Sequence, residues 1–173
     1  MTVEERFDIV PSNILVGTLE QELTDEIGRE LKLSEILSSQ KGKYDYILID
    51  CPPSLSLLNV NALLYANEAF VPVSTDFLAL DALKKMSQTV SEINELFDHD
   101  IKITLVIPTL YDRRSKACVE TLKEIKRGYE ELVANPIRMN SKLREAPSQG
   151  KDIFEYAKRS PGALDYKKLA QLV

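Results

Sequence analysis

The sequence of 173 residues has little of several residue types on which common kinds of site depend. Its two cysteines, Cys51 and Cys118, are too few for a disulfide framework, and this usage indicates the cytosol. Its single histidine, His99, argues against a zinc site and against a histidine-based catalytic triad. No apolar run reaches about 18 residues, so we expect no transmembrane helix and no membrane partner.

Glycine is scarce as well, with six residues, roughly half the usual share of about 7%. A phosphate-binding P-loop needs two glycines five positions apart, the second followed by Lys and then by Ser or Thr. The only Gly-Lys pairs are Gly42-Lys43 and Gly150-Lys151, and neither has a glycine five residues before its own or a Ser or Thr after its lysine. These 173 residues therefore contain no Walker A loop.

Basic and acidic residues occur in similar numbers. The chain has 22 basic and 27 acidic residues, a net charge of −5, which excludes a globally basic nucleic-acid footprint but leaves room for a local basic patch. Hydrophobic residues make up 44%, enough to offset the entropy of ordering, so global disorder is excluded. The length suits one domain, and we expect residues 1–173 to form a single one.

Strand-like and helix-like segments alternate along the chain, a pattern typical of an α/β fold with a mostly parallel sheet flanked by helices. We expect strands at 7–10, 44–50, 69–73, 101–110 and 132–137, with 101–110 central because it is the most apolar. Helices are expected at 19–38, broken near Gly28, and at 54–65, 78–97, 116–131 and 162–172. Residues 138–161 are expected to form a long loop, with or without one helical turn.

The strongest local signal is YDYILIDCPP at 44–53, an apolar strand that ends in Asp50 and is followed by two prolines. Ligands bind beyond the carboxyl ends of strands in open α/β sheets. An acid at that place can hold Mg²⁺ through water, as the Walker B aspartate does. Alternatively, Asp50 caps the next helix; the Asp-x-Pro-Pro continuation favours the Walker B interpretation.

Stretches along almost the whole chain resemble the ParA/Soj branch of the deviant Walker ATPases, which segregate plasmids and chromosomes. They are FDIVPSN (7–13), Glu22 with Gly28-Arg29-Glu30, YDYILIDCPPSLSLLNVNAL (44–63), TLYDRR (109–114), LREAPSQGK (143–151) and Ser160-Pro161-Gly162-Ala163. The resemblance implies a P-loop NTPase-like fold that is incomplete at the amino end, since the match begins inside the family sequence at FDIVPSN. At least one upstream strand–loop–helix unit is then expected to be missing.

The resemblance also implies roles for individual residues. Asp50 corresponds to the Walker B acid, which would hold Mg²⁺ through water only together with a nucleotide, and the switch loop beside the γ-phosphate comprises Cys51, Pro52 and Pro53. The adenine would be enclosed by the segments that contain Thr109, Asp112, Arg138, Met139 and Asn140. Here the chain departs from the family, which has Ile-Pro-Arg-Asn where this sequence has Ile137-Arg138-Met139-Asn140. The EAPSQGK stretch (145–151) either closes the fold as a turn-rich loop or serves the nucleotide or a dimer.

ParA-type dimers bind DNA nonspecifically through basic residues, and such contacts to phosphate depend on salt. In this chain the residues that would contact DNA are Arg113, Arg114, Lys142 and Arg144. The alternative is that they are ordinary solvated surface charges. The resemblance further implies a homodimer in the complete protein, a ParB-type partner and a cytoplasmic, nucleoid-associated location. A MinD-like membrane role is disfavoured, because the ending at 165–173 carries only two lysines.

Complete members of the family use Mg²⁺ and ATP. Without Walker A, we expect this chain to be a ParA-like partitioning ATPase that neither binds nor hydrolyses ATP alone. Three interpretations stay open: a fragment of a full ATPase, a shortened relative that pairs with a full-length partner, or a fold remnant with a rebuilt core. The alternative function is a non-hydrolysing binding module that docks on a full-length ParA-type or ParB-type protein.

Overall fold

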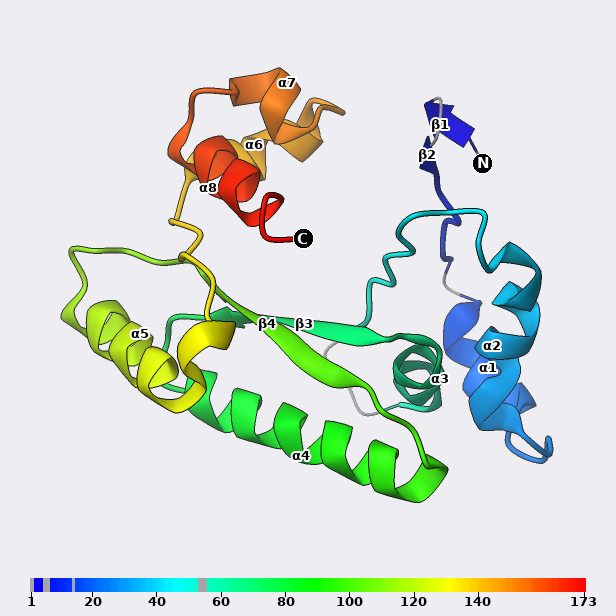
Figure 1. Cartoon of the computed structure of the whole chain (residues 1–173). Coiled ribbons are helices and arrows are strands. Elements are labelled where there is room, and N and C mark those ends of the chain that lie inside the picture. Colours follow the sequence, from blue (N-terminus) through cyan, green and yellow to red (C-terminus); the bar gives the residue numbers. More distant parts are fainter. Residues whose placement is uncertain (1, 5–6, 14, 53–55) are drawn as a thin grey trace. The chain divides into compact units, whose positions relative to one another are not determined.

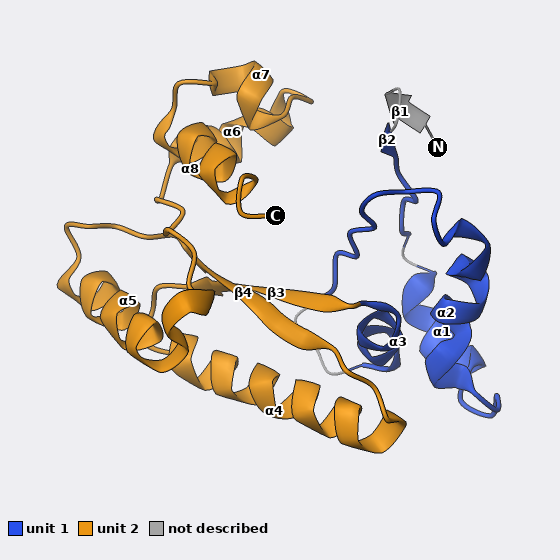
Figure 2. Cartoon of the chain, in the orientation of Figure 1, with its two compact units in different colours: residues 1–66 blue, residues 67–173 orange. Residues whose placement is uncertain are grey.

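The structure is a computed structural model, and it describes residues 2–4, 7–13, 15–52 and 56–173. The chain divides into two compact units, residues 1–66 and 67–173, which are coloured separately in Figure 2. Helices and strands are labelled in Figure 1.

The first unit is mainly helical. Two short strands, β1 (Thr2–Glu4) and β2 (Phe7–Asp8), pair antiparallel, and the helices α1 (Val16–Glu22), α2 (Lys32–Leu37) and α3 (Leu57–Tyr65) follow. Gly28, with φ at 71°, separates α1 from the 3₁₀ helix Arg29–Leu31, which confirms the predicted break. The buried amide of Asn61 on α3 donates to the carbonyl oxygen of Arg29 at 2.8 Å and accepts from the backbone N–H of Leu33 at 2.9 Å. This one side chain therefore joins α3 to the two segments that precede it.

The predicted strand at 44–50 is wrong, as is the extension of β2 to residue 10. Residues 44–50 form no ladder with any described segment, and Tyr46 and Leu48 are 66% and 81% exposed. The hydroxyl of Tyr44 donates to a carboxylate oxygen of Asp8 at 2.6 Å, which is a side-chain contact and no substitute for a ladder. An apolar, β-branched sequence favours a strand, but a strand forms only where a neighbouring backbone accepts and donates its hydrogen bonds.

The second unit is built on parallel strands. β3 (Glu68–Ser74) and β4 (Lys102–Thr109) pair in parallel from Glu68 with Lys102 to Ser74 with Thr109. On the other side of β4, residues 133–138 run parallel to it through isolated bridges that join Val106 to Val133 and Tyr111 to Arg138. The predicted strand at 132–137 is therefore present only as this irregular ladder. The central place of β4 is confirmed, and Pro72 lies in a strand that is paired on one side only among the described residues.

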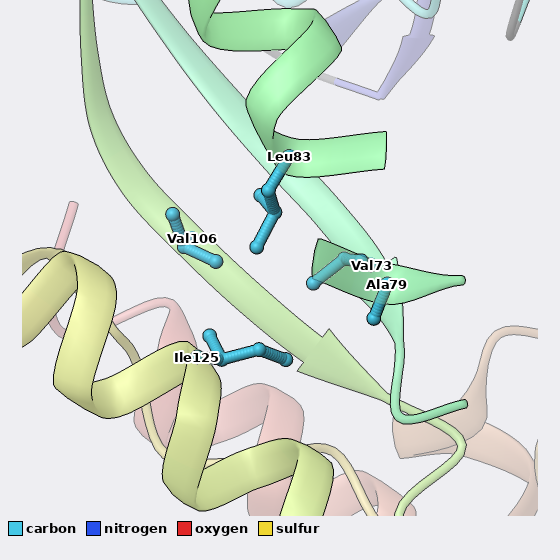
Figure 3. Close-up of a cluster of buried hydrophobic side chains, with 5 residues drawn as sticks. All are labelled: Val73, Ala79, Leu83, Val106 and Ile125. Carbon is cyan, nitrogen blue, oxygen red and sulfur yellow. The ribbon is translucent and has the colours of Figure 1, made fainter. Parts of the chain in front are cut away.

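Two long helices cover the sheet. α4 (Ala79–Phe97) and α5 (Lys116–Tyr129) match the predicted helices closely, and Ser115 caps α5 by accepting from the N–H of Cys118. Figure 3 shows the buried cluster between strands and helices, which consists of Val73, Ala79, Leu83, Val106 and Ile125. Its members come from β3, β4, α4 and α5, so these four elements form one core. Parallel strands flanked by helices confirm the predicted α/β class.

The predicted loop at 138–161 is wrong. The structure has two helices there, α6 (Ser141–Ser148) and α7 (Ile153–Ala157), and then α8 (Pro161–Leu169). Each of the three begins with a side-chain cap, from Asn140, Asp152 and Ser160 respectively. These capping residues are visible in the sequence, but Pro147 near the end of α6 and Gly150 between α6 and α7 favour a loop when they are considered alone.

Candidate functional site

The carboxyl ends of the parallel strands gather polar groups, as the α/β topology predicts. The backbone N–H and the hydroxyl of Thr75, just after β3, both donate to the carbonyl oxygen of Thr109 at the end of β4, at 3.1 and 3.3 Å. The hydroxyl of Thr109 donates back to the carbonyl oxygen of Val73 at 3.2 Å. Thr75 is buried and is not among the predicted site residues, although its place after a predicted strand could have indicated it.

The two segments assigned to the base region lie side by side. The N–H of Tyr111 donates to the carbonyl oxygen of Ile137 at 3.1 Å, and the N–H of Met139 donates to the carbonyl oxygen of Tyr111 at 2.9 Å. Residues far apart in the sequence thus meet at one edge of the sheet. Within the first segment, Leu110 lies between Thr109 and Tyr111 and adopts a positive φ of 53° that non-glycine residues rarely take, so the backbone is strained there.

Asp112 is held by Arg114. One carboxylate oxygen accepts from the backbone N–H and from Nε of Arg114 at 2.9 and 3.0 Å, and the other accepts from Nη2 at 2.9 Å. The hydrogen bonds from the Arg114 side chain, and to a smaller extent the one from its backbone N–H, lower the pKa of Asp112 to about 2. The carboxylate is therefore ionised and already paired at neutral pH. Nearby, the backbone N–H of Asp112 and the hydroxyls of Thr75 and Ser115 lower the pKa of the Cys118 thiol.

Arg138 is tied to the last helix. Its Nε and Nη2 donate to the two carboxylate oxygens of Asp165 on α8, each at 2.8 Å, and its backbone N–H donates to the same carboxylate at 3.0 Å. Burial acts to raise the pKa of Asp165, but the hydrogen bonds and the charge of Arg138 outweigh it, so this pKa lies below its ordinary value. The sequence did not indicate Asp165, because the pair spans 27 positions and no local pattern connects them.

Asn140 and Lys142 are likewise engaged within the unit. The side-chain oxygen of Asn140 accepts from the N–H of Lys142 at 2.8 Å and caps α6. Nζ of Lys142 donates to Glu145 at 2.7 Å, and the hydroxyl of Tyr156 on α7 donates to the same carboxylate oxygen at 2.9 Å. The hydrogen bond and the charge of Lys142 lower the pKa of Glu145. Four of the five predicted base-region side chains therefore make a hydrogen bond within the chain. The fifth, Met139, is apolar and half-exposed.

Asp50 lies in the first unit, whereas the base-region residues lie in the second. It is exposed, as are Cys51 and Pro52, and the third switch-loop residue, Pro53, lies outside the described residues. The carbonyl oxygen of Pro52 accepts from the side-chain amide of Asn59 on α3 at 2.7 Å, which anchors this end of the segment. Within the described ranges, no three His, Cys, Asp or Glu residues gather closely enough to hold a metal ion.

The four basic residues assigned to DNA lie in the second unit. Arg113 and Arg114 occupy the turn between β4 and α5, and Lys142 and Arg144 lie on α6. All four are exposed. Arg114 and Lys142 are paired with Asp112 and Glu145, while Arg113 and Arg144 make no ion pair with a described acid.

Surface hollows occur among the described residues of the second unit. One, of about 390 Å³, lies between α4 and α5 and is lined by residues that include Leu80, Lys84 and Tyr129. Another, of about 290 Å³, lies beside the end of β3 and is lined by residues that include Ser74, Asp76 and Leu78. Neither is lined by a predicted site residue. In the described part of the chain, no helix has the length and apolar character needed to cross a membrane.

Parallel strands with covering helices and polar groups at their carboxyl ends define an α/β protein with an open parallel sheet. The family model for an AAA domain matches residues 1–103. The sporulation initiation inhibitor protein Soj of Bacillus subtilis is 38% identical over 173 residues, 99% of this chain. The chromosome-partitioning ATPase Soj of Treponema pallidum is 40% identical over 163 residues, 94% of this chain. The chain belongs to the ParA/Soj family of partitioning ATPases.

The fold agrees with that of solved relatives. Cobyrinic acid a,c-diamide synthase from Mycobacterium smegmatis, with bound ADP and magnesium, superposes with a TM-score of 0.74 at 29% identity, covering 93% of this chain and 59% of that one. The sequence-based recognition of the family and the P-loop NTPase-like fold are both confirmed. The chain spans 68% of the length of the Bacillus subtilis protein and 64% of the Treponema pallidum protein.

The described residues do not fit the phosphate end of a magnesium nucleotide. The sequence has no Walker A loop, Asp50 is exposed outside any ladder, and within the described ranges it belongs to no group of three or more His, Cys, Asp or Glu residues that could hold a metal ion. Mg²⁺ in such sites is held by one or two carboxylates together with the nucleotide's own phosphates, so Asp50 alone does not build one.

Proposed function

We propose that this chain takes part in ParA-type partitioning of chromosomes or plasmids, and that these 173 residues neither bind nor hydrolyse ATP by themselves. The carrying observation is the family likeness, which extends over 94–99% of the chain in its two Soj relatives. As in the family, the assembled system would use Mg²⁺ and ATP, a ParB-type partner, nonspecific DNA and a dimer, in the cytoplasm at the nucleoid.

Specific roles follow within this proposal. Asp50 would be the Walker B-like acid, with Cys51, Pro52 and Pro53 as the switch loop beside it. Segments 109–112 and 138–140 would form the base side of a nucleotide site. Their meeting at the carboxyl edge of the sheet supports this assignment, since that edge is where α/β proteins bind ligands. The phosphate side would need groups that these residues lack.

Calorimetric titration of the 173-residue chain with Mg-ATP tests the nucleotide part. We expect no binding heat up to millimolar ATP, with a cooperative urea transition as the control that the chain is folded. Binding with a Kd near 1 μM, worth about −8 kcal/mol, would require a phosphate site built without a Walker A loop and would overturn this part.

A second titration, with a ParB-type protein from the same cell, tests the partitioning part. Binding in the micromolar range supports it, and no binding at about 100 μM contradicts it.

The second candidate function is a non-hydrolysing regulator that docks on a full-length ParA-type or ParB-type protein, and the same titration bears on it. The internal engagement of Asp112, Arg138 and Asn140 favours that candidate, because these side chains already have partners within the chain. Docking on the ParA-type protein, with no ATP turnover of its own, would support the regulator.

A further inference from the structure

The backbone of segment 138–140, with Ile137 just before it, is fixed on one side by a ladder to the end of β4 and to Tyr111 just after it. The N–H groups of Ile137 and Met139 donate to the carbonyl oxygens of Pro108 and Tyr111, at 2.8 and 2.9 Å. The N–H of Arg138 lies between them in the sequence and does not join this ladder. Its acceptor is the carboxylate of Asp165 at 3.0 Å.

Three hydrogen bonds therefore converge on one carboxylate. The guanidinium of Arg138 binds both of its oxygens at 2.8 Å in the planar, two-pronged geometry that gives charge-assisted bonds their strength. Nη2 of Arg138 also donates to the carbonyl oxygen of Pro161 at 3.3 Å. The Asp165 side chain is only 10% exposed, so solvent screens this pair less than a surface pair.

The helix that carries Asp165 is itself firmly seated. Leu169 at the end of α8 packs against the buried cluster of Ile107, Ala134 and Ile137. At the start of α8, a Cβ placed on Gly162 would lie 2.7 Å from Cγ of Leu143, so the backbone of α8 approaches α6 closely. Because α8 is constrained at both ends, the Asp165 carboxylate has a fixed position, and Arg138, which binds it, is fixed as well.

We propose that Asp165 is the positioning residue of segment 138–140. The family pattern places a proline where this chain has Arg138, and a proline fixes φ and has no N–H to satisfy. With arginine there, the backbone regains a donor and a rotatable φ, and Asp165 binds the donor and restrains the residue from both its backbone and its side chain. The inference rests on the proposed function in one respect only, that this segment is the base side of the site.

Methionine-methyl NMR on the whole chain, without nucleotide, tests the proposal. The sequence has three methionines, of which Met139 lies in the segment and Met86 lies on α4 as an internal control. In Asp165→Ala we expect the methyl signal of Met139 to shift and broaden, while that of Met86 stays unchanged. Amide hydrogen exchange on the same chain should show the Arg138 N–H exchanging with solvent at least about tenfold faster. Glu155→Ala is the matched control, since it removes from the neighbouring helix α7 an acid that forms an exposed ion pair with Lys151.

Two further variants separate positioning from general support. Asp165→Glu keeps the charge and both oxygens, and should restore most of the Arg138 amide protection. Arg138→Lys keeps the positive charge but removes the two-pronged geometry, and should leave the amide protected while the Met139 methyl broadens. An unchanged Arg138 amide in Asp165→Ala, or equal changes at Met86 and Met139, would overturn the proposal. Because no nucleotide is present, these results are independent of the ATP titration.

Discussion

The side-chain amide of Asn94 holds both backbone groups of Ile101. Nδ2 of Asn94 donates to the carbonyl oxygen of Ile101 at 2.9 Å, and Oδ1 accepts from its N–H at 3.0 Å. Ile101 is 1% exposed and immediately precedes β4, and Asn94 lies in the last turn of α4. The turn between them passes through Asp98 at a φ of 50°, so this pair sets where the central strand begins.

Asn94→Ala should lower the free energy of unfolding by about 1–3 kcal/mol, because it leaves a buried donor and a buried acceptor without partners. Asn94→Asp keeps an acceptor for the N–H of Ile101 but sets a carboxylate oxygen against its carbonyl oxygen, so it should destabilise the chain as well. Urea denaturation monitored by circular dichroism measures both. Equal stability of Asn94→Ala and the wild type would show that water satisfies the two groups of Ile101.

Gly162 should not tolerate a side chain. A Cβ there would meet Leu143 at 2.7–3.1 Å, and overpacking of this kind costs about 1–3 kcal/mol. Gly162→Ala should therefore lower the urea midpoint, and Leu143→Ala in the same chain should relieve part of the added destabilisation. Gly128→Ala is the matched control: nothing lies within 4 Å of its Cβ, and helix propensity should make that variant more stable by up to about 1 kcal/mol. Two glycine variants with the same effect would contradict the close packing of α8 on α6.

The parts of the fold that the sequence predicted well are those with strong local signals. The apolar periodicity of α4 and α5 and the mostly apolar run of β4 each depend on residues within one element, so sequence spacing alone indicates them. The break at Gly28 could likewise be predicted from the residue itself, since a residue without a Cβ readily adopts the positive φ found there.

The misses depend on partners elsewhere in the chain. Residues 44–50 have strand composition, but a ladder also needs a neighbouring backbone, which sequence composition does not reveal. The pair of Arg138 and Asp165 joins positions 27 apart, and nothing near either residue points to the other. In the candidate site, the family pattern indicated Thr109, Asp112 and residues 138–140, whose role at a base stays a prediction, whereas it gave no sign of their internal partners.

The carboxyl group of Asp112 should titrate near pH 2. The side-chain and then the backbone hydrogen bonds of Arg114 lower its pKa from an ordinary 3.8 to about 2. Because the folded pKa lies below the unfolded one, the stability that this pair contributes is present above about pH 3.8 and is lost as the pH falls through 2. Carbon-detected NMR titration measures the midpoint directly.

Arg114→Gln should raise that midpoint toward the ordinary value, while Arg113→Gln, which removes only a nearby charge, should move it much less. An Asp112 midpoint near 3.8 in the wild-type chain would show that the ion pair with Arg114 does not persist in solution.

Within the proposed function, Arg113 and Arg144 should contribute more to DNA binding than Arg114 and Lys142. The first two make no ion pair with a described acid, whereas the others must leave Asp112 and Glu145 to reach a phosphate. Fluorescence polarisation with a labelled duplex at several salt concentrations measures this. A substitution that removes one phosphate contact should reduce the slope of log K against log salt by about 0.9.

Arg113→Gln should therefore lower both affinity and slope, and Arg114→Gln should change them less. Lys126→Gln is the matched control, because Lys126 is exposed, makes no ion pair with a described acid and lies in the last turn of α5, whereas Arg113 lies just before the first turn of that helix. If Lys126→Gln and Arg113→Gln weaken binding equally, the contacts reflect overall charge, and the four residues are ordinary solvated surface charge. If only the carboxyl-end variants weaken it, DNA binds at the same edge of the sheet that carries the predicted base region.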